Sequence, residues 1–249
     1  MNNLIEATLI KKKFFSNNLF SVFFSAKIEN FIPGQYNRII FINQNSEKIQ
    51  RAYSYVNSPK EKIIEFYVAL IPNGIITPHL FSLLPQQKIN IYQQSFGFFT
   101  LKNIPICKHL WMFATGTAIG PYLSILQGEK KINQFNKIIL IHAVKFEKDL
   151  NYLKLMLKLQ KKYNNKLQII TILSREKKDG SLFGRIPKLL TEKKIEKKVD
   201  LKINKKDSHI MLCGNPNMVK ETTKILNSIY NLNIHTQRNA GQITIEHYW

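Results

Sequence analysis

The chain has 249 residues, of which 44% are hydrophobic and 11% aromatic, so we expect it to fold into one large domain or two modest ones. The formal net charge is +21, but only five of the 37 basic residues are Arg and the lysines are spread along the chain, which argues against a nucleic-acid partner. Because no apolar run could span a bilayer and two cysteines give no disulfide framework, we expect a cytoplasmic protein without stable membrane association.

The first hundred residues are predicted to be rich in β-strands. Short apolar runs are separated by turn residues such as Pro33-Gly34, and this spacing is typical of a barrel or a sandwich. Only Thr77–Leu84 is expected to be helical, with Pro78 in its first turn. The predicted strands are Leu4–Ile10, Leu19–Ala26, Tyr36–Ile42, Ile63–Leu70 and Lys88–Tyr92.

After Leu101 the pattern changes to apolar runs that alternate with helix-like segments, which indicates a parallel sheet covered by helices. We therefore predict two domains, residues 1–101 and 102–249, the first β and the second α/β. The Lys-rich stretch Glu192–Lys206 is expected to be an exposed loop or frayed helix. The predicted strands are Leu110–Ala114, Ile138–Val144, Leu167–Leu173 and Ile210–Cys213, and the predicted helices are Ile119–Gln127, Leu150–Lys162 and Met218–Tyr230.

The segment Arg51-Ala52-Tyr53-Ser54 carries the first candidate binding residues. Arg51 offers a permanent, forked cation to a phosphate. In an extended chain Tyr53 lies on the same face and offers a flat ring, whereas Ser54 points the opposite way with a hydroxyl. An ordinary strand with an exposed Arg and a packed Tyr would look the same.

Two later turns could each receive an anion. In Gly74–Pro78 a glycine turn leads into a helix start, where backbone N–H groups and the helix dipole favour a pyrophosphate. In Ala114–Pro121 the residues Gly116 and Gly120 allow a tight turn between a strand and a helix, although no G-x-G-x-x-G fingerprint is present. A capped helix without a ligand, with Thr77 as the N-cap, and a plain strand–helix turn are the simpler alternatives.

The final candidates lie at a strand end and at the chain terminus. Cys213-Gly214-Asn215-Pro216 closes an apolar strand and opens a helix, and loops at the carboxyl ends of parallel strands form ligand crevices. Cys213 could also simply be packed there. Tyr248 and Trp249 end the chain, and two such rings are expected to pack on a flat surface, either protein or a planar cofactor.

Taken together and in this order, these motifs closely resemble those of the bacterial ferredoxin/flavodoxin–NADP+ reductases. The resemblance covers essentially the whole chain and includes Tyr55–Pro59, Pro121–Gln127 and Gly184–Pro187. It implies an α+β protein of two domains, an N-terminal antiparallel β-barrel that holds FAD (1–101) and an α/β parallel-sheet domain that binds NADP (102–249). It also implies that the C-terminal aromatic tail returns to the flavin.

The resemblance assigns FAD contacts residue by residue. Arg51 matches the Arg at the FAD pyrophosphate, Tyr53 the ring on one flavin face, Ser54 the hydroxyl near flavin N5, and Trp249 the aromatic residue on the other face. Ser54, Cys213, Glu246 and Trp249 are the groups expected nearest to the hydride transfer. The remaining FAD contacts implied by the resemblance are Ala52, Tyr67, Val68, Ala69, Ile75, Ile76, Thr77, Thr117 and Tyr248.

Two arginines point to NADP rather than NAD. Arg175 follows a predicted strand after Ser174, and Arg185 follows Gly184; in a chain so rich in Lys, both suggest a need for a guanidinium, which a 2′-phosphate supplies. Lys145 is a departure, because similar reductases often have Arg there, and Lys loses the bidentate geometry. The full predicted set for NADP is Val144, Lys145, Ser174, Arg175, Arg185, Asn215 and Met218.

The resemblance predicts an FAD-dependent oxidoreductase that moves electrons between NADPH and an acidic flavodoxin or ferredoxin, acting as a monomer without a metal. A basic surface would steer an acidic carrier into contact. One alternative is an NADH- or NADPH-dependent flavin reductase of the same superfamily. Another is a basic binding protein that uses the fold without catalysis.

Overall fold

The computed structural model describes residues 3–42 and 47–248. These residues divide into two compact units. One unit runs to Leu101 and also contains Gly120–Glu129, whereas the other contains Lys102–Ile119 and the chain from Lys130 onward. We call them the barrel unit and the sheet unit and describe each separately.

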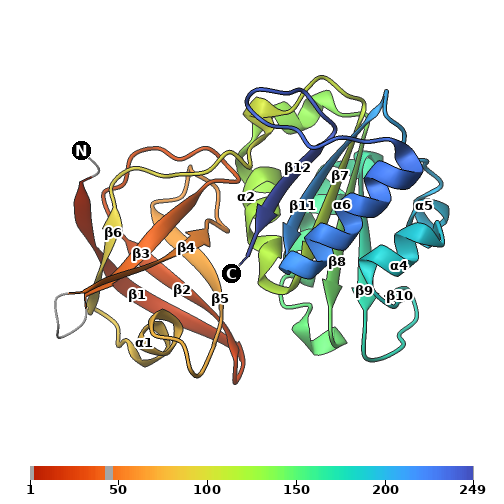
Figure 1. The fold of residues 1–249 in the computed structure, drawn as a ribbon. Coiled ribbons are helices and arrows are strands. Elements are labelled where there is room, and N and C mark those ends of the chain that lie inside the picture. Colours follow the sequence, from red (N-terminus) through yellow and green to blue (C-terminus); the bar gives the residue numbers. More distant parts are fainter. Residues whose placement is uncertain (1–2, 43–46, 249) are drawn as a thin grey trace. The chain divides into compact units, whose positions relative to one another are not determined.

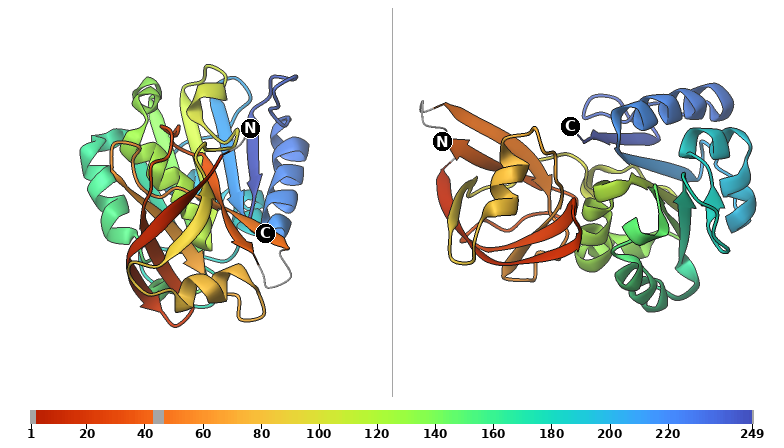
Figure 2. Two further views of the ribbon diagram at one scale, coloured as in Figure 1. Left: turned by 90° about the vertical axis from the view of Figure 1, so that its left-hand side faces the viewer. Right: turned by 90° about the horizontal axis from the view of Figure 1, so that it is seen from below.

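The barrel unit is built on an antiparallel sheet with the strand order β4-β3-β6-β1-β2-β5 (Figure 1). Its two edge strands meet, because Tyr55, directly after β4, forms an antiparallel bridge with Phe66 of β5 and Val56 N donates to Glu65 O at 3.0 Å. This pairing curls the sheet upon itself, as further views show (Figure 2). The strands are β1 (Leu4–Ser16), β2 (Leu19–Ser25), β3 (Tyr36–Ile42), β4 (Lys48–Ser54), β5 (Ile63–Ala69) and β6 (Lys88–Tyr92).

Apolar side chains from every part of this sheet form one core. Phe20, Val22 and Phe24 alternate along β2 and are fully buried, as expected for the inward face of a strand. The ring of Tyr55 stacks on Phe31 with centroids 3.9 Å apart, which fills the place where the two sheet edges meet. Helix α1 (Ile76–Ser82) covers part of this core through Ile76 and Leu80.

Helix α2 (Gly120–Gly128) belongs to the barrel unit although its sequence neighbours belong to the other one. The Ser124 hydroxyl donates to Asn57 O at 2.8 Å, and the Gln127 amide donates to Val56 O at 2.9 Å. A Cβ added at Gly128 would lie 2.6 Å from Pro59 Cδ, so only glycine permits this approach. The helix is thus fixed to the segment that follows β4.

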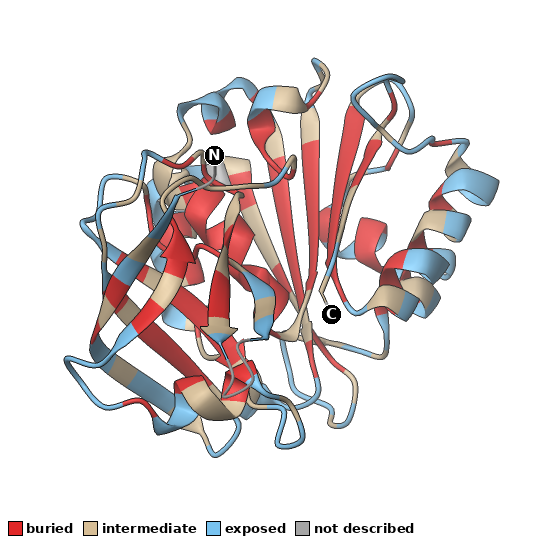
Figure 3. Cartoon of the chain, turned by 60° about the vertical axis from the view of Figure 1, so that its left-hand side comes forward, coloured by how far each residue is buried: buried red, intermediate tan, exposed pale blue. Residues whose placement is uncertain are grey.

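The sheet unit contains a parallel sheet with the order β10-β9-β8-β7-β11-β12 (Figure 1). Its central strands are buried on both faces, so they appear as continuous red ribbons in Figure 3. Helices α4, α5 and α6 pack on one face, and α3 packs near Val144 and Leu173. The elements are β7 (His109–Thr115), β8 (Lys137–Val144), α3 (Leu153–Lys162), β9 (Leu167–Leu173), β10 (Leu182–Phe183), α4 (Ile186–Thr191), α5 (Lys194–Val199), β11 (Ser208–Gly214), α6 (Pro216–Tyr230) and β12 (Ile243–His247).

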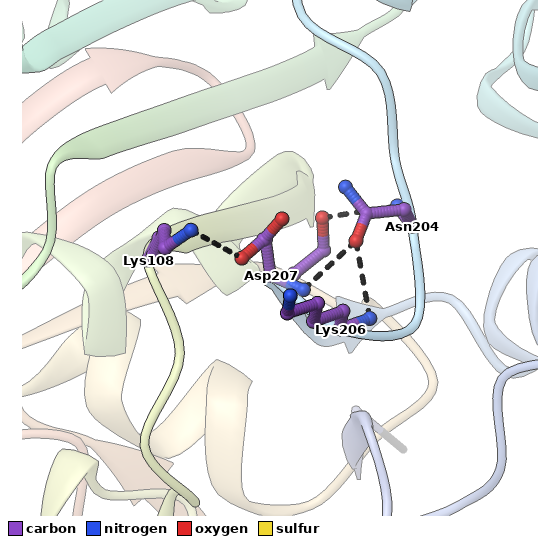
Figure 4. A network of polar contacts seen from close by, with 5 residues as sticks. Lys108, Asn204, Lys206 and Asp207 are labelled. Carbon is purple, nitrogen blue, oxygen red and sulfur yellow. Dashed lines mark hydrogen bonds and ion pairs between the residues drawn. The ribbon is translucent and has the colours of Figure 1, made fainter.

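A polar network joins the starts of β7 and β11 (Figure 4). Asn204 Oδ1 accepts hydrogen bonds from the backbone N–H groups of Lys206 at 3.1 Å and Asp207 at 2.8 Å. The Asp207 carboxylate pairs with Lys108 Nζ at 3.0 Å, while its carbonyl accepts from the backbone of Lys108 and His109. The network therefore fixes the relative register of the two central strands at their amino ends.

Two elements of this unit go beyond the sequence expectations. For Glu192–Lys206 an exposed loop or a frayed helix was expected, and the structure has a helix, α5, that buries Ile195 and Val199, which are spaced one helical turn apart. For Ile243–His247 no strand was predicted, but it forms β12 and pairs with β11. In both places a few apolar residues suffice because the neighbouring element supplies the rest of the core.

Candidate functional site

In the barrel unit, the predicted FAD residues gather where β4 and β5 meet. The antiparallel bridge between Tyr55 and Phe66 places the residues before Tyr55 beside those after Phe66. Tyr53 and Ser54 therefore run alongside Tyr67 and Val68. Helix α1 lies against β3 and β4, with the His79 ring 4.8 Å from the ring of Phe41 on β3.

Arg51 is exposed and available to bind an anion. Its Nη1 donates to the carbonyl of its neighbour Gln50 at 2.9 Å, and no ion pair with Arg51 is found within residues 3–42 and 47–248. Ala52 is exposed beside it. A forked cation without a carboxylate partner on an open strand edge suits a phosphate ligand.

Tyr53 and Ser54 are more enclosed than Arg51. The Tyr53 ring is half-buried, 6.0 Å from the ring of Phe66, and burial raises the pKa of its hydroxyl although Arg51 opposes the shift. Ser54 is buried. On β5, Tyr67 and Val68 are buried and Ala69 is half-buried, and the Tyr67 ring meets Phe15 edge-on at 5.5 Å. The arrangement offers a neutral aromatic surface and a hydroxyl next to one cation.

The loop before α1 is closed by Thr77 in a way the sequence did not predict. Thr77 is not the N-cap of the helix; Ile75 holds that position, without a side-chain cap. The Thr77 hydroxyl instead accepts from Ile71 N at 2.9 Å and lies 3.3 Å from Ile71 O, so it fastens the loop across six residues. Ile76 is buried, whereas Ile75 is exposed.

In the sheet unit, the remaining predicted residues that the structure describes lie at or just beyond the carboxyl ends of the parallel strands, apart from Met218 in the first turn of α6. Such ends form the ligand crevice of open α/β sheets. Thr117 follows β7 and is buried, Val144 ends β8, and Asn215 follows β11. Glu246 lies in β12, paired with Cys213 of β11.

Three basic residues occupy successive positions along this edge, and we call Lys145, Arg175 and Arg185 the basic row. Arg175 N donates to Lys145 O at 3.0 Å, so the pairing of β8 and β9 continues past both strands. Phe183 of β10 pairs with Leu173 of β9, which places Arg185 and Arg175 each two residues beyond the pair. All three side chains are exposed, and none has an ion-pair partner within the part of the chain that the structure describes.

The end of β11 is built by a close contact with β7. Gly214 has φ +135°, and a Cβ there would lie 2.0 Å from Thr115 Oγ1. The same hydroxyl oxygen accepts from Asn215 N at 2.9 Å, and Asn215 Oδ1 caps α6 by accepting from Asn217 N and Met218 N. Asn215 thus has a structural role besides the predicted NADP contact, and Met218 is buried in the core beneath it.

Cys213 is fully buried, with Sγ 3.8 Å from Glu246 Oε1. Burial raises the pKa of this thiol, and the nearby Glu246 raises it further, so it remains protonated and uncharged. Ser174 donates to Val144 O at 3.3 Å, which holds the chain after β9 against the end of β8.

The chain end extends along the same edge. Tyr248 N donates to Gly214 O at 3.0 Å, so the residue after β12 is held at the end of β11. Trp249, predicted to cover the flavin, lies outside the described residues. No helix of the described ranges has the length and apolar character needed to cross a membrane.

His142 was assigned no role from the sequence, yet it lies beside the predicted site. It is fully buried on β8, and its Nε2 lies 2.9 Å from the carbonyl oxygen of Gly116 in the turn after β7. A His-Ala pair beside Lys145 was visible in the sequence, but the contact joins residues 26 positions apart and follows only from the strand pairing.

Comparisons with known proteins agree on one family. Residues 6–96 match the oxidoreductase FAD-binding domain and residues 112–224 the oxidoreductase NAD-binding domain. Over the full length of both chains, the sequence is 49% identical to a flavodoxin/ferredoxin–NADP reductase of Buchnera aphidicola subsp. Baizongia pistaciae and 42% identical to that of Escherichia coli K12. A ferredoxin NADP+ reductase from Neisseria gonorrhoeae, solved with bound FAD and NADP, superposes with a TM-score of 0.92 at 28% identity, covering 99% of each chain.

Proposed function

Because the chain belongs to the flavodoxin/ferredoxin–NADP reductase family, we propose that it passes electrons between NADPH and a small one-electron carrier, flavodoxin or ferredoxin, by means of bound FAD. FAD, when bound, accepts a hydride and releases the electrons one at a time. We further propose that the carrier is acidic and that the protein acts as a monomer in the cytoplasm.

The observation that carries the NADP part of the proposal is the basic row. Three exposed cations on successive strand ends, with no ion-pair partner among the described residues, supply the charge that a 2′-phosphate requires. Arg175 and Arg185 offer forked donors, and Lys145 adds a point charge. Ser174 and Asn215 lie at the same edge and would orient the remainder of the dinucleotide, with Val144 and Met218 as apolar neighbours.

The charge and the residue types of the barrel unit support FAD binding there. Arg51 would bind the pyrophosphate together with the backbone of Ile75–Thr77, while Tyr53 would present its ring to one flavin face. Ser54 would place its hydroxyl near the reacting edge, and Tyr67–Ala69 would contact the flavin and adenosine portions. Because the Tyr53 hydroxyl stays protonated, this surface remains neutral over the physiological pH range.

The sheet unit would contribute the groups nearest to the nicotinamide. Cys213 would offer an uncharged thiol and Glu246 a carboxylate beside it, while Thr117 would bound the site at the turn after β7. Tyr248 and Trp249 would cover the flavin face opposite to Tyr53. None of these side chains forms a covalent bond in the reaction; they orient the reactants and limit access of water.

An anaerobic absorption spectrum tests this function. Purified protein supplied with FAD should show flavin bands that NADPH bleaches rapidly and NADH slowly, and addition of flavodoxin or ferredoxin should restore them. Equal bleaching by both coenzymes with free flavin as the best acceptor would indicate a flavin reductase instead. Protein that stays colourless after FAD is supplied would contradict any flavoenzyme.

A further inference from the structure

His142 reaches from β8 to the turn that follows β7. Its Nε2 lies 2.9 Å from Gly116 O, and because a carbonyl oxygen only accepts, Nε2 carries the hydrogen. The other ring nitrogen, Nδ1, is buried and has no hydrogen-bond partner within the described residues. Burial lowers the pKa of the ring to about 4, although the bond to Gly116 opposes the shift, so the ring is neutral and keeps this tautomer at physiological pH.

Gly116 lies in the left-handed region, with φ +56°, which glycine adopts readily. A Cβ at this position would meet nothing within 4 Å, so packing on this side of the residue does not hold the turn Gly116–Ile119. His142 instead holds the Gly116 carbonyl from β8. Just before the turn, the hydroxyl of Thr115 accepts from Asn215 N at the end of β11.

We propose that His142 is a positioning residue for hydride transfer: its Nε2–H fixes the Gly116 carbonyl and thereby sets the place of Thr117 in the turn between the two cofactors. This rests on the proposed function, which assigns Thr117 to the FAD site. His142 is fully buried, so we expect it to act through the turn rather than on a coenzyme. An apolar residue could pack at this position as well, and a buried imidazole with an unsatisfied Nδ1 costs free energy. The directed N–H donor of Nε2 explains why a histidine is present despite this cost.

Two variants separate the directed hydrogen bond from simple packing. His142→Gln keeps a donor at nearly the reach of Nε2, whereas His142→Met fills a similar volume without an N–H group. With FAD-loaded protein, His142→Met should lower kcat for NADPH oxidation about 10-fold or more, since displacements on the ångström scale cost up to ~10²-fold. The KM for NADPH should change little because the basic row is intact, and His142→Gln should recover most of kcat.

Hydrogen exchange provides a second readout that does not depend on catalysis. In the protein without added FAD or NADPH, the amides of the Gly116–Ile119 turn should exchange faster in His142→Met than in wild type, and at close to the wild-type rate in His142→Gln. Wild-type protein that bound no FAD would contradict the proposed function, while the exchange result would still decide the role of His142 in the turn. Unchanged exchange and kcat in His142→Met, or equal losses in both variants, would overturn the inference.

Discussion

At the scale of single residues, the proposed role of the basic row is to distinguish the two nicotinamide coenzymes. Arg175→Ala and Arg185→Ala should each weaken NADPH binding by about 1–3 kcal/mol, the scale of a lost charged hydrogen bond. NADH binding should change little because it has no 2′-phosphate. Coenzyme titrations followed by flavin absorbance measure both affinities.

Arg238→Ala is the matched control for these two variants. Arg238 is also exposed, but it lies in the loop before Ile243, which pairs with Ile210 near the start of β11 and so belongs to the amino edge of the sheet. Its removal costs the same charge without touching the basic row. Equal losses of NADPH and NADH affinity in the Arg175 and Arg185 variants would show that they do not read the 2′-phosphate.

Gly214 has a second, steric requirement besides its backbone conformation. Gly214→Ala should destabilise the protein by about 1–3 kcal/mol through its positive φ alone, and by more because the new Cβ would lie 2.0 Å from Thr115 Oγ1. Gly180→Ala is the control, since Gly180 has φ +86° with nothing within 4 Å of its Cβ position. Thermal unfolding midpoints compare the two, and equal shifts would refute the steric contribution.

The candidate residues were proposed from local sequence motifs, whereas their hydrogen-bond partners in the structure could not be predicted. Asn215 was visible beside Cys213, but its bond to Thr115 joins residues 100 positions apart, and the strand register creates it. Thr77 stood at the expected helix start, yet its hydroxyl closes a loop back to Ile71 rather than capping the helix. A hydroxyl near a helix start has several backbone groups within reach, and the sequence does not select among them.

At the scale of secondary-structure elements, the anchoring of α2 to the barrel unit rests on a buried hydrogen bond. Ser124→Ala removes the donor to Asn57 O and leaves that buried carbonyl short of a partner, at a cost of about 1–3 kcal/mol. Ser228→Ala on α6 is the matched control, because its exposed hydroxyl lies 3.4 Å from Ile225 O and its loss should change stability by less than about 0.5 kcal/mol. Thermal unfolding of both variants checks this, and similar midpoints would contradict the anchoring.

Elements with strong apolar runs were the predictable ones. Strands β7, β8 and β11 of the sheet unit are largely buried on both faces and so appear as nearly continuous apolar runs between turns, while β9 is a run rich in Ile and Leu. β4 is an edge strand with a polar composition, and β12 begins only six residues before the chain end, so neither has that signal. α5 depends on Ile195 and Val199 among lysines, a pattern too sparse to separate from a solvated charged segment.

At the scale of the whole molecule, two buried neutral histidines make the protein less stable at acid pH. Burial lowers the pKa of His142 to about 4, and burial with the nearby His235 lowers that of His209 to about 3, against 6.5 in an unfolded chain. Between pH 6.5 and 4 these two side chains therefore bind more protons in the unfolded state than in the folded state. They do not lower the free energy of unfolding above pH 6.5, and they lower it progressively as the pH drops below that value.

The variant His142→Gln removes the protonation of residue 142 from the pH dependence of stability, because Gln does not titrate. Its unfolding free energy should fall less steeply between pH 6 and 4.5 than that of wild type, by up to about 1.4 kcal/mol per pH unit. Urea titrations at several pH values measure the slope. Identical slopes in the two proteins would mean that His142 already takes up a proton in the folded state.

The net charge of +21 predicts how the protein meets its carrier. Association with an acidic flavodoxin or ferredoxin should slow by about 10-fold or more as ionic strength rises from 0.01 to 1 M, because screening shortens the Debye length from roughly 30 to 3 Å. Stopped-flow reduction of the carrier measures this, with an uncharged one-electron acceptor as the control. A carrier rate independent of salt would exclude electrostatic steering.

The placement of α2 has a consequence for how this molecule can be divided. The chain passes between the two units at residues 101–102, 119–120 and 129–130, so neither unit is one uninterrupted stretch of the gene. A recombinant fragment ending at Leu101 would lack α2, which donates hydrogen bonds to the carbonyls of Asn57 and Val56. The fragment starting at Lys102 would contain α2 but not the segment to which the helix is bound. A chimera that exchanges the coenzyme-binding part between relatives must therefore keep α2 with the barrel unit. Joining the two chains at a single point after Leu101 would not do so.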